Sequence, residues 1–167
     1  MVDVEFWSED GRFGLRVPGE MLSRVLELSR QASPLETGGI LTGFYTDAHN
    51  LAVVTQATGA PRDSESGRTF FVRGTAGLQR WLNRLWRKER RFYLGDWHSH
   101  PGEVPHPSPT DEVQLEEIAG GESRKCPEPV LLLVGGPVAD TCDARAYVLP
   151  RGGTLVELFS SERKPNQ

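Results

Sequence analysis

The sequence predicts an α/β (α+β) fold, with a mixed, curved sheet of about eight strands flanked by about three helices. Short runs rich in β-branched and aromatic residues are bounded by Gly, Pro, Asn and Asp, as strands are. Three other segments carry apolar residues at helical spacing. The two kinds of segment are interleaved along the 167 residues rather than strictly alternating, which favours a sheet that mixes parallel and antiparallel strands.

The first part of the chain predicts four strands and one helix. The helix carries Met21, Leu22, Val25 and Leu26 on one side, follows Pro18 and stops before Ser33-Pro34, as expected for helix boundaries. The predicted ranges are strands Val2–Trp7, Phe13–Val17, Gly39–Tyr45 and Leu51–Thr58 and helix Gly19–Arg30.

The remainder predicts five strands and two helices after a polar loop that begins near Pro61. Helix Thr75–Glu89 is amphipathic, and the second helix starts at Ser108, within a segment that four prolines, Pro101, Pro105, Pro107 and Pro109, stiffen. The predicted ranges are strands Thr69–Val72, Arg91–Trp97, Val130–Gly135, Ala144–Leu149 and Thr154–Ser160, and helices Thr75–Glu89 and Ser108–Ala119. We expect residues 1–160 to form one domain and residues 161–167 a polar tail.

Composition narrows the class of protein. A formal charge of −4 argues against whole-surface attraction to nucleic acid or anionic membrane. The sequence has no apolar run long enough to span a bilayer and no basic, apolar leader, so we expect a cytoplasmic protein. Cys126 and Cys142 are too few for a four-thiolate zinc site, and we expect both to be reduced thiols.

The chemistry is concentrated in the segment that follows strand Arg91–Trp97. His98 and His100 are two residues apart, so an extended chain directs both imidazoles to the same face. Asp111 can return a carboxylate to them through the proline-rich loop. Two imidazoles and one carboxylate, with water in the fourth position, make a catalytic type of zinc site.

Local helix chemistry supports the same interpretation of Asp111. If Ser108 is the N-cap and Pro109 the first helical residue, Asp111 is the third residue of its helix. The positive end of the helix dipole then favours the ionised carboxylate.

These residues stand at the spacing of a known family. The motif reads His98-Ser99-His100, seven residues, Ser108, two residues and Asp111, and a distant Glu36 in a Glu-x-x-Gly segment precedes it. This pattern resembles that of the JAMM (MPN-plus) metallopeptidases. The resemblance implies their cytidine-deaminase-like architecture and one zinc ion bound by His98, His100 and Asp111. It also implies that Glu36 is the general acid/base and that Ser108 stabilises the oxyanion of the tetrahedral intermediate.

Several neighbouring side chains leave alternatives open. Asp96 lies two residues before His98, on the same strand face, and could be the base or an acid that supports the metal ligands. Ser99 could support the ligands in the same way, and Glu103 is a third candidate base. We interpret His106 as a loop residue, and His49 lies in a turn with no evident partner.

The resemblance also implies a class of substrate. Members of the family cut after the C-terminal Gly of ubiquitin or ubiquitin-like proteins, and this chain is similar to the deconjugating peptidases of bacterial ubiquitination-like operons, including antiviral CBASS operons. A Gly-ended ubiquitin-like protein or its conjugate would be the substrate, and E1/E2-like enzymes of the same operon would be partners. We expect a strand edge near Arg68, Thr69 and Phe70 to hold the extended tail. The alternatives are processing of a sulfur-carrier protein and a non-catalytic MPN scaffold.

One further feature is a basic helix face. Six basic residues and one acid lie between Arg80 and Arg91, with Arg80, Arg84 and Lys88 at helical spacing. The simplest interpretation is a solvated face; docking of an acidic protein is the alternative, and nucleic acid is less favoured.

Overall fold

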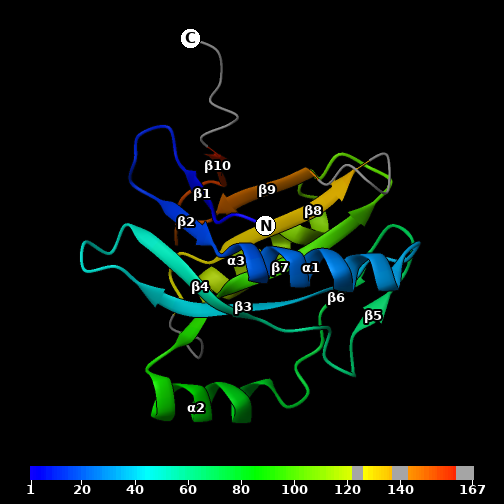
Figure 1. Cartoon of the computed structure of the whole chain (residues 1–167), viewed down its shortest axis with the longest axis horizontal. Coiled ribbons are helices and arrows are strands. Elements are labelled where there is room, and N and C mark those ends of the chain that lie inside the picture. Colours follow the sequence, from blue (N-terminus) through cyan, green and yellow to red (C-terminus); the bar gives the residue numbers. More distant parts are fainter. Residues whose placement is uncertain (122–125, 137–142, 161–167) are drawn as a thin grey trace.

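Eight strands close into a barrel in this computed structural model, which describes residues 1–121, 126–136 and 143–160 (Figure 1). Neighbouring strands are antiparallel except for two parallel pairs, β7 with β8 and β2 with β4. The order around the barrel is β1 (Val4–Trp7), β10 (Val156–Ser160), β9 (Asp143–Val148), β8 (Val130–Gly136), β7 (Phe92–Pro101), β3 (Gly38–Tyr45), β4 (Leu51–Ala57) and β2 (Gly14–Val17). The described residues therefore have the predicted mixed α+β class, and the curved sheet closes on itself.

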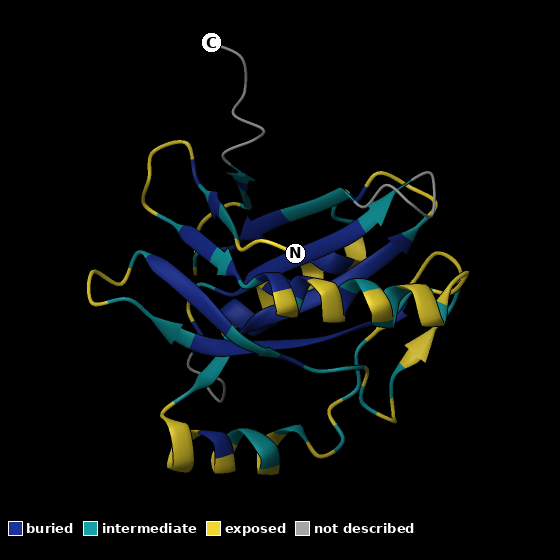
Figure 2. Cartoon of the chain, in the orientation of Figure 1, coloured by how far each residue is buried: buried dark blue, intermediate teal, exposed yellow. Residues whose placement is uncertain are grey.

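Three helices accompany the barrel, α1 (Gly19–Ala32), α2 (Leu78–Glu89) and α3 (Pro109–Gly120). Helix α1 buries Leu22 and Val25 in the main apolar core, whereas α3 buries Leu115 and Ala119 in a second cluster. Successive residues of β8 separate these layers, since Leu132 faces the main core and its neighbours Leu131 and Leu133 face α3. Figure 2 shows that the barrel strands are mostly buried, whereas α1 and α2 each expose one side.

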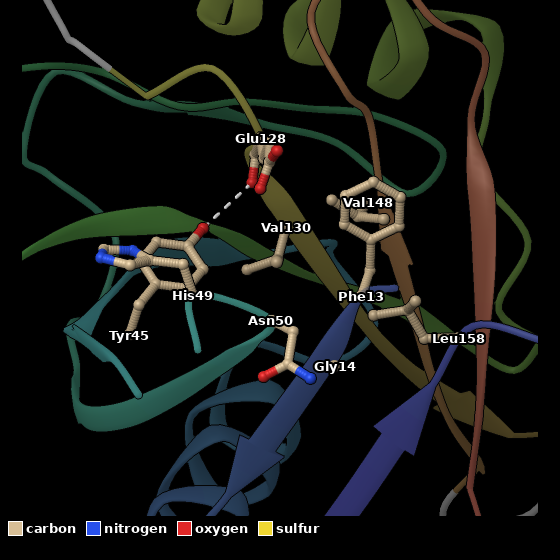
Figure 3. Close-up of a pocket in the computed structure, with 9 residues that line it drawn as sticks. All are labelled: Phe13, Gly14, Tyr45, His49, Asn50, Glu128, Val130, Val148 and Leu158. Atoms are coloured by element: carbon tan, nitrogen blue, oxygen red, sulfur yellow. Dashed lines mark hydrogen bonds between the residues drawn. The ribbon is translucent and has the colours of Figure 1, made fainter. Parts of the chain in front are cut away.

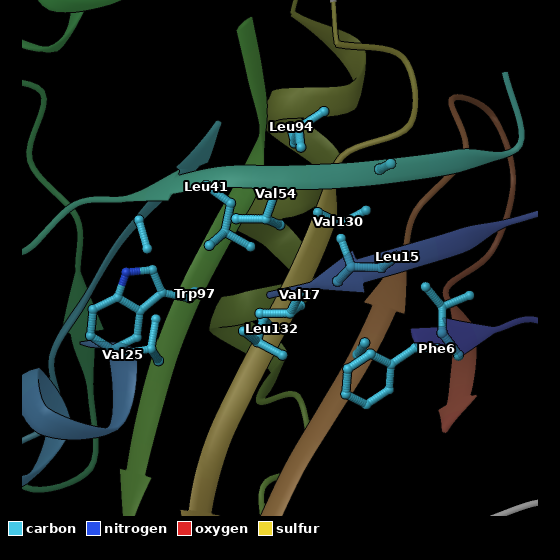
Figure 4. Packing of buried hydrophobic residues seen from close by; sticks show 14 of the residues in the cluster. Phe6, Leu15, Val17, Val25, Leu41, Val54, Leu94, Trp97, Val130 and Leu132 are labelled. Atoms are coloured by element: carbon cyan, nitrogen blue, oxygen red, sulfur yellow. The ribbon is translucent and has the colours of Figure 1, made fainter. Parts of the chain in front are cut away.

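Trp97 of β7 is the largest fully buried side chain of the main core (Figure 4). Its indole Nε1–H donates to the carbonyl oxygen of Thr58 at 2.8 Å, so the one polar atom of the ring is satisfied. A buried indole adds a large apolar surface, provided that its N–H finds a partner. Trp97 thus fixes the orientation of β7, and with it the side to which the flanking histidines point.

The segment between β4 and α2 differs from the prediction. Glu65–Ser66, expected in a loop, forms β5 and pairs with β6 (Phe71–Val72), so Thr69 and Phe70 belong to the turn rather than to a strand. Helix α2 begins at Leu78 instead of Thr75, because the carboxylate of Asp63 accepts the backbone N–H groups of Thr75 and Ala76 and holds them in a turn.

Strand β7 is longer than predicted. It runs through to Pro101, so His98 and His100 lie inside the strand, in its last four residues, and not beyond its end. The parallel ladder with β8 continues over these residues, pairing His98 with Leu133 and His100 with Gly135. A paired strand holds both imidazoles more rigidly than the loop start that the sequence suggested.

Two smaller expectations concern the cysteines and the membrane. Cys126 is a buried free thiol whose Sγ lies 3.7 Å from the carbonyl oxygen of Leu94, whereas Cys142 lies outside the described residues, as does the tail 161–167. Among the described residues, no helix combines the length and the apolar character needed to cross a bilayer.

Candidate metal centre

Strand β7 carries both candidate histidines on its outer face. Because side chains alternate along a strand, the inward direction of Trp97 sends His98 and His100 outward, toward α3 and β6. Both are nonetheless buried, with 2% of His98 and 8% of His100 exposed. Buried imidazoles need partners, and the nearest are supplied by the start of α3.

The first turn of α3 positions Asp111. Ser108 is the N-cap, and its Oγ accepts the backbone N–H of Asp111 at 3.1 Å. In return, Oδ2 of Asp111 accepts the backbone N–H of Ser108 at 2.8 Å, which completes a capping box. The predicted cap is therefore present, and it directs the Asp111 carboxylate back toward β7.

The three side chains meet. Asp111 Oδ1 lies 2.9 Å from His98 Nδ1, and Oδ2 lies 3.4 Å from His100 Nε2. Burial by itself would raise the pKa of the Asp111 carboxyl, but hydrogen bonds from His100 and His98 outweigh it and hold that pKa far below its usual range. Asp111 is thus ionised, as a metal ligand must be.

The cluster combines donor groups that commonly bind metal ions. The side chains touch one another directly, and among the described residues no three His, Cys, Asp or Glu side chains are arranged to hold an ion. Two observations nevertheless fit zinc: two imidazoles and one ionised carboxylate are its catalytic donor set, and His98 Nε2 is buried with no hydrogen-bond partner among the described residues. An unpaired buried ring nitrogen is unfavourable by itself. The donor set therefore fits zinc, and His98, His100 and Asp111 are the residues that would hold the ion.

Glu36 is held beside the cluster by the segment that enters β3. Thr37 N–H donates to Ser99 Oγ at 3.0 Å, and Ser99 N–H donates to Thr37 O at 2.8 Å, which ties this segment to β7. Burial raises the pKa of Glu36, and the nearby carboxylates of Asp111 and Glu103 add to the shift, while His100 and His98 oppose it. A carboxyl with a raised pKa beside a metal-type cluster suits proton transfer.

Asp96 occupies a different environment from Glu36. Its Oδ2 accepts from Arg73 Nε at 2.8 Å and its Oδ1 accepts from the Tyr93 hydroxyl at 2.7 Å, so both oxygens have partners. Arg73 and Asp96 form a buried ion pair. Asp96 shares the outer face of β7 with the histidines, but its partners there are Arg73 and Tyr93.

The remaining candidates lie around the cluster. Arg68, Thr69 and Phe70 form the turn between β5 and β6, which is closed by the bond from Gly67 N–H to Phe70 O at 2.9 Å. Phe70 is 46% exposed. His106 faces Arg145, with 3.4 Å between Nδ1 and Nη1, and Glu103 is an exposed residue of the loop after β7.

His49 lies at the other end of β3 from Glu36, beside a small cavity of about 10 Å³ that Tyr45 and Glu128 also line (Figure 3). This space is about that of one water molecule. His49 contacts the Tyr45 ring, with 6.1 Å between ring centroids, so the structure gives it a packing partner and places it away from the cluster.

Sequence reasoning missed two residues in the surroundings of the site. Phe71 packs edge-on against the His98 ring, with 5.1 Å between centroids, and Arg73 holds Asp96. The only signal for Phe71 was its place in a short apolar run, and nothing local distinguished Arg73 from an exposed arginine.

Comparison with solved structures agrees on the fold. The solution structure of protein DSY2949 from Desulfitobacterium hafniense matches with a TM-score of 0.60 at 19% identity, over 83% of this chain and 86% of that chain. A mixed α+β barrel with two strand histidines and a capped helix-start aspartate places this protein in the JAB-domain class. The chain belongs to the family described as prokaryotic homologs of the JAB domain, whose model matches residues 18–149.

Two sequence relatives carry functional names. The chain is 36% identical over 156 residues to a protein of Enterobacter hormaechei subsp. hoffmannii called "CD-NTase/cGAS isopeptidase", covering 93% of this chain and 86% of the relative. It is 32% identical over 125 residues to "Probable metalloprotease y4qB" of Sinorhizobium fredii, covering 72% of this chain and 76% of the relative. This family membership agrees with the JAMM resemblance of the sequence.

Proposed function

We propose that the protein is a zinc-dependent isopeptidase that hydrolyses the bond after the C-terminal Gly of a ubiquitin-like protein. The observation that carries the proposal is the buried cluster of His98, His100 and Asp111, with Glu36 held beside it. The names of two relatives, an isopeptidase and a probable metalloprotease, support the reaction class. In this proposal the three clustered residues hold one zinc ion within the JAMM architecture.

Each residue of the site then has one task. A bound zinc ion supplies a Lewis acid, which polarises oxygen atoms and makes water more acidic. Glu36, with its raised pKa, accepts a proton from water at its carboxylate and passes it to the leaving amine. The Ser108 hydroxyl accepts the Asp111 N–H and can still donate its own proton to the developing oxyanion.

The site also needs a groove for an extended Gly-ended tail. Among the described strands, each barrel strand is paired on both sides over at least part of its length. The two-stranded β5–β6 sheet stands apart from that ladder, and each of its strands is paired with the other on one side only, which leaves an edge for main-chain pairing. We place the tail there, with Arg68, Thr69 and Phe70 contacting it.

We infer the biological setting from the name of the Enterobacter hormaechei relative. A name that joins an isopeptidase to a CD-NTase suits a deconjugating role in a bacterial antiviral operon. In that setting the protein acts in the cytoplasm on a ubiquitin-like protein or its conjugate, and E1/E2-like enzymes of the operon make the bond that it removes.

Incubation with a panel of fusions that carry Gly-ended ubiquitin-like tails tests the proposal. The panel includes a sulfur-carrier protein, and each reaction is run with and without a chelator. We expect chelator-sensitive cleavage after the terminal Gly, loss of cleavage in Glu36→Gln with retained zinc and fold, and normal cleavage in the control Glu103→Gln. An active Glu36→Gln variant would show that the base is another residue. Zinc-independent cleavage, or none with any fusion, would contradict the proposed function and favour a scaffold role.

The tail groove has its own test. Replacing Arg68, Thr69 and Phe70 by Gly-Ser-Gly removes the ordered turn and changes no residue of β7 or α3. We expect KM to rise much more than kcat falls, because the contacts serve binding. A fall in kcat with unchanged KM would reject this groove.

A further inference from the structure

We propose that Arg73 is a positioning residue: anchored by Asp96 and Tyr93, it fixes strand β6 so that Phe71 sets the orientation of His98. The inference deepens the proposed function and rests on it. It concerns a residue for which the sequence pattern gave no role and which contacts neither the histidines nor Asp111 in any bond described above. Arg73 is connected to His98 through contacts of β7 and the β5–β6 hairpin.

The anchor is a buried ion pair between β6 and β7. Arg73 follows directly after β6, and its Nε donates to Asp96 Oδ2 at 2.8 Å with about 5% of either side chain exposed. The Tyr93 hydroxyl donates to the other carboxylate oxygen at 2.7 Å. Burial, together with the negative charge of Asp96, raises the pKa of Tyr93 well above 10.0, so this hydroxyl keeps its proton.

The guanidinium also fixes its own backbone. Arg73 Nη1 donates to the carbonyl oxygen of Gly74 at 2.9 Å, so one planar group holds Asp96 and the chain that follows β6 together. A lysine offers a compact charge on a flexible stem and cannot make two bonds in fixed directions in this way. The geometry therefore calls for arginine specifically.

Phe71 lies two residues before Arg73 and contacts His98, one of the candidate metal ligands. Its ring meets the His98 ring edge-on at 5.1 Å between centroids. The backbone of Gly38 packs closely against both rings, since a Cβ at Gly38 would lie 2.6 Å from Phe71 Cε1 and 2.7 Å from His98 Cδ2. The Gln114 side chain of α3 also reaches the Phe71 carbonyl oxygen at 3.5 Å, so the strand is held from both sides.

Gly67, which lies across the turn from Phe71 in the same hairpin, contacts Glu36, the residue proposed as the base. The carbonyl oxygen of Gly67 accepts the backbone N–H of Glu36 at 2.8 Å. The β5–β6 hairpin thus contacts His98 through Phe71 and Glu36 through Gly67, and the turn between them is where the substrate tail is proposed to bind. Arg73 holds this unit to β7, which connects tail binding with the geometry of the metal ligands.

The contacts also explain Asp96. A catalytic base needs a free oxygen directed at substrate or water, whereas both Asp96 oxygens are bonded to Arg73 and Tyr93. Its place beside His98 on the outer face of β7 serves the anchor instead. Asp96 and Arg73 act through Phe71, so their effect on the metal is one of orientation.

The test compares Arg73→Met, Arg73→Lys and Phe71→Leu with the parent and with Arg80→Met, an exposed arginine on α2 that serves as the control. Zinc affinity of the substrate-free protein is measured by competition with a chromogenic chelator, and kcat and KM are measured separately on a cleaved fusion. We expect Arg73→Met to lower zinc affinity and kcat each by about 10- to 100-fold, as losses of outer support around metal ligands do. Arg73→Lys recovers part of the loss, and Arg80→Met changes neither value.

Phe71→Leu keeps the ion pair but removes the ring contact, so it should lower zinc affinity with little change in the far-UV spectrum. If Arg73→Met does not fold, Phe71→Leu and Tyr93→Phe decide the question. Zinc affinity and kcat within twofold of the parent in the folded variants would overturn the positioning role and leave the proposed function standing. A parent that binds zinc tightly but cleaves no fusion would overturn the substrate assignment alone, and a parent that binds no zinc would overturn both.

Discussion

Ser108 combines two roles that substitution can separate. It caps α3 by accepting the Asp111 N–H, and it is proposed to donate its hydroxyl proton to the oxyanion. Ser108→Ala removes both functions. Ser108→Gly removes the hydroxyl but keeps a residue that is well tolerated at the N-cap, and Ser108→Thr retains both functions.

The loss of the cap and the loss of the oxyanion donor have effects of different size. Losing a Ser cap for Ala lowers the free energy of unfolding by about 1 kcal/mol, whereas Gly costs only a few tenths. For a domain of this size, 1 kcal/mol lowers Tm by roughly 2–4 °C. Losing one oxyanion donor lowers kcat by about 10²–10³-fold. A protein with several kcal/mol of stability stays folded at 25 °C after losing 1 kcal/mol, so unfolding cannot produce the fall in kcat.

The assay measures Tm by calorimetry on the zinc-loaded protein and kcat on the cleaved fusion at saturating substrate. We expect Ser108→Ala to lose both stability and kcat, Ser108→Gly to lose kcat with a nearly unchanged Tm, and Ser108→Thr to stay close to the parent in both. Zinc content is measured on each variant, because the same cap orients Asp111.

The outcome that refutes this reasoning is a kcat within about threefold of the parent in both Ser108→Ala and Ser108→Gly. Ser108 would then be a cap alone. A Tm for Ser108→Ala equal to that of the parent would contradict the predicted stabilisation by the cap, because it would show that the capping box adds no stability.

Three further predictions follow from neighbouring contacts. Gly38→Ala should lower the free energy of unfolding by about 1–3 kcal/mol in urea titrations, because its Cβ would lie 2.4 Å from Trp97 O. The control is Gly120→Ala, whose Cβ would meet open space. Equal losses of stability in the two variants would contradict the close approach at Gly38. Burial lowers the pKa of His100, but its bond to Asp111 and the nearby carboxylates raise it above 6.5. The apo-state stabilisation by protonated His100 is therefore full below pH 6.5 and is lost as pH rises through the folded pKa. Zinc must displace that proton, so apparent zinc affinity should rise up to about tenfold per pH unit until His100 deprotonates; a pH-independent affinity in chelator competition would contradict this. Burial raises the pKa of Cys126 to about 12, so iodoacetamide at pH 8 should alkylate it only in denaturant, as read by peptide mass spectrometry, and rapid native labelling would refute the burial.

Local patterns predicted the parts of the site that depend on neighbours in sequence. Alternation along a strand sufficed to bring His98 and His100 to one face, and the N-cap pattern sufficed to place Ser108 at the cap and Asp111 as the third residue of its helix. The class of the fold followed in the same way from the strand and helix periods.

The missing parts depend on contacts that no local pattern encodes. Strand β5 has only two residues, and it pairs because the turn after it is closed by Gly67 and Phe70. The Arg73–Asp96 pair joins segments whose sequences give no sign of each other, and closure of the barrel by β1 and β10 joins the first strand to the last. Such pairings arise from tertiary packing, which overrides local propensity.

The ladder between β3 and β7 has a consequence for the order of folding. Hairpins such as β3–β4 and β8–β9 connect neighbouring segments and can form early, whereas the bond from Thr37 to Ser99 spans 62 residues. Closing so large a loop loses chain entropy before the contact compensates for it. A chain with only its local hairpins therefore does not bring Glu36 next to His98, and these residues meet only once β7 has docked on β3. A newly made chain passes through its early folding without the assembled site.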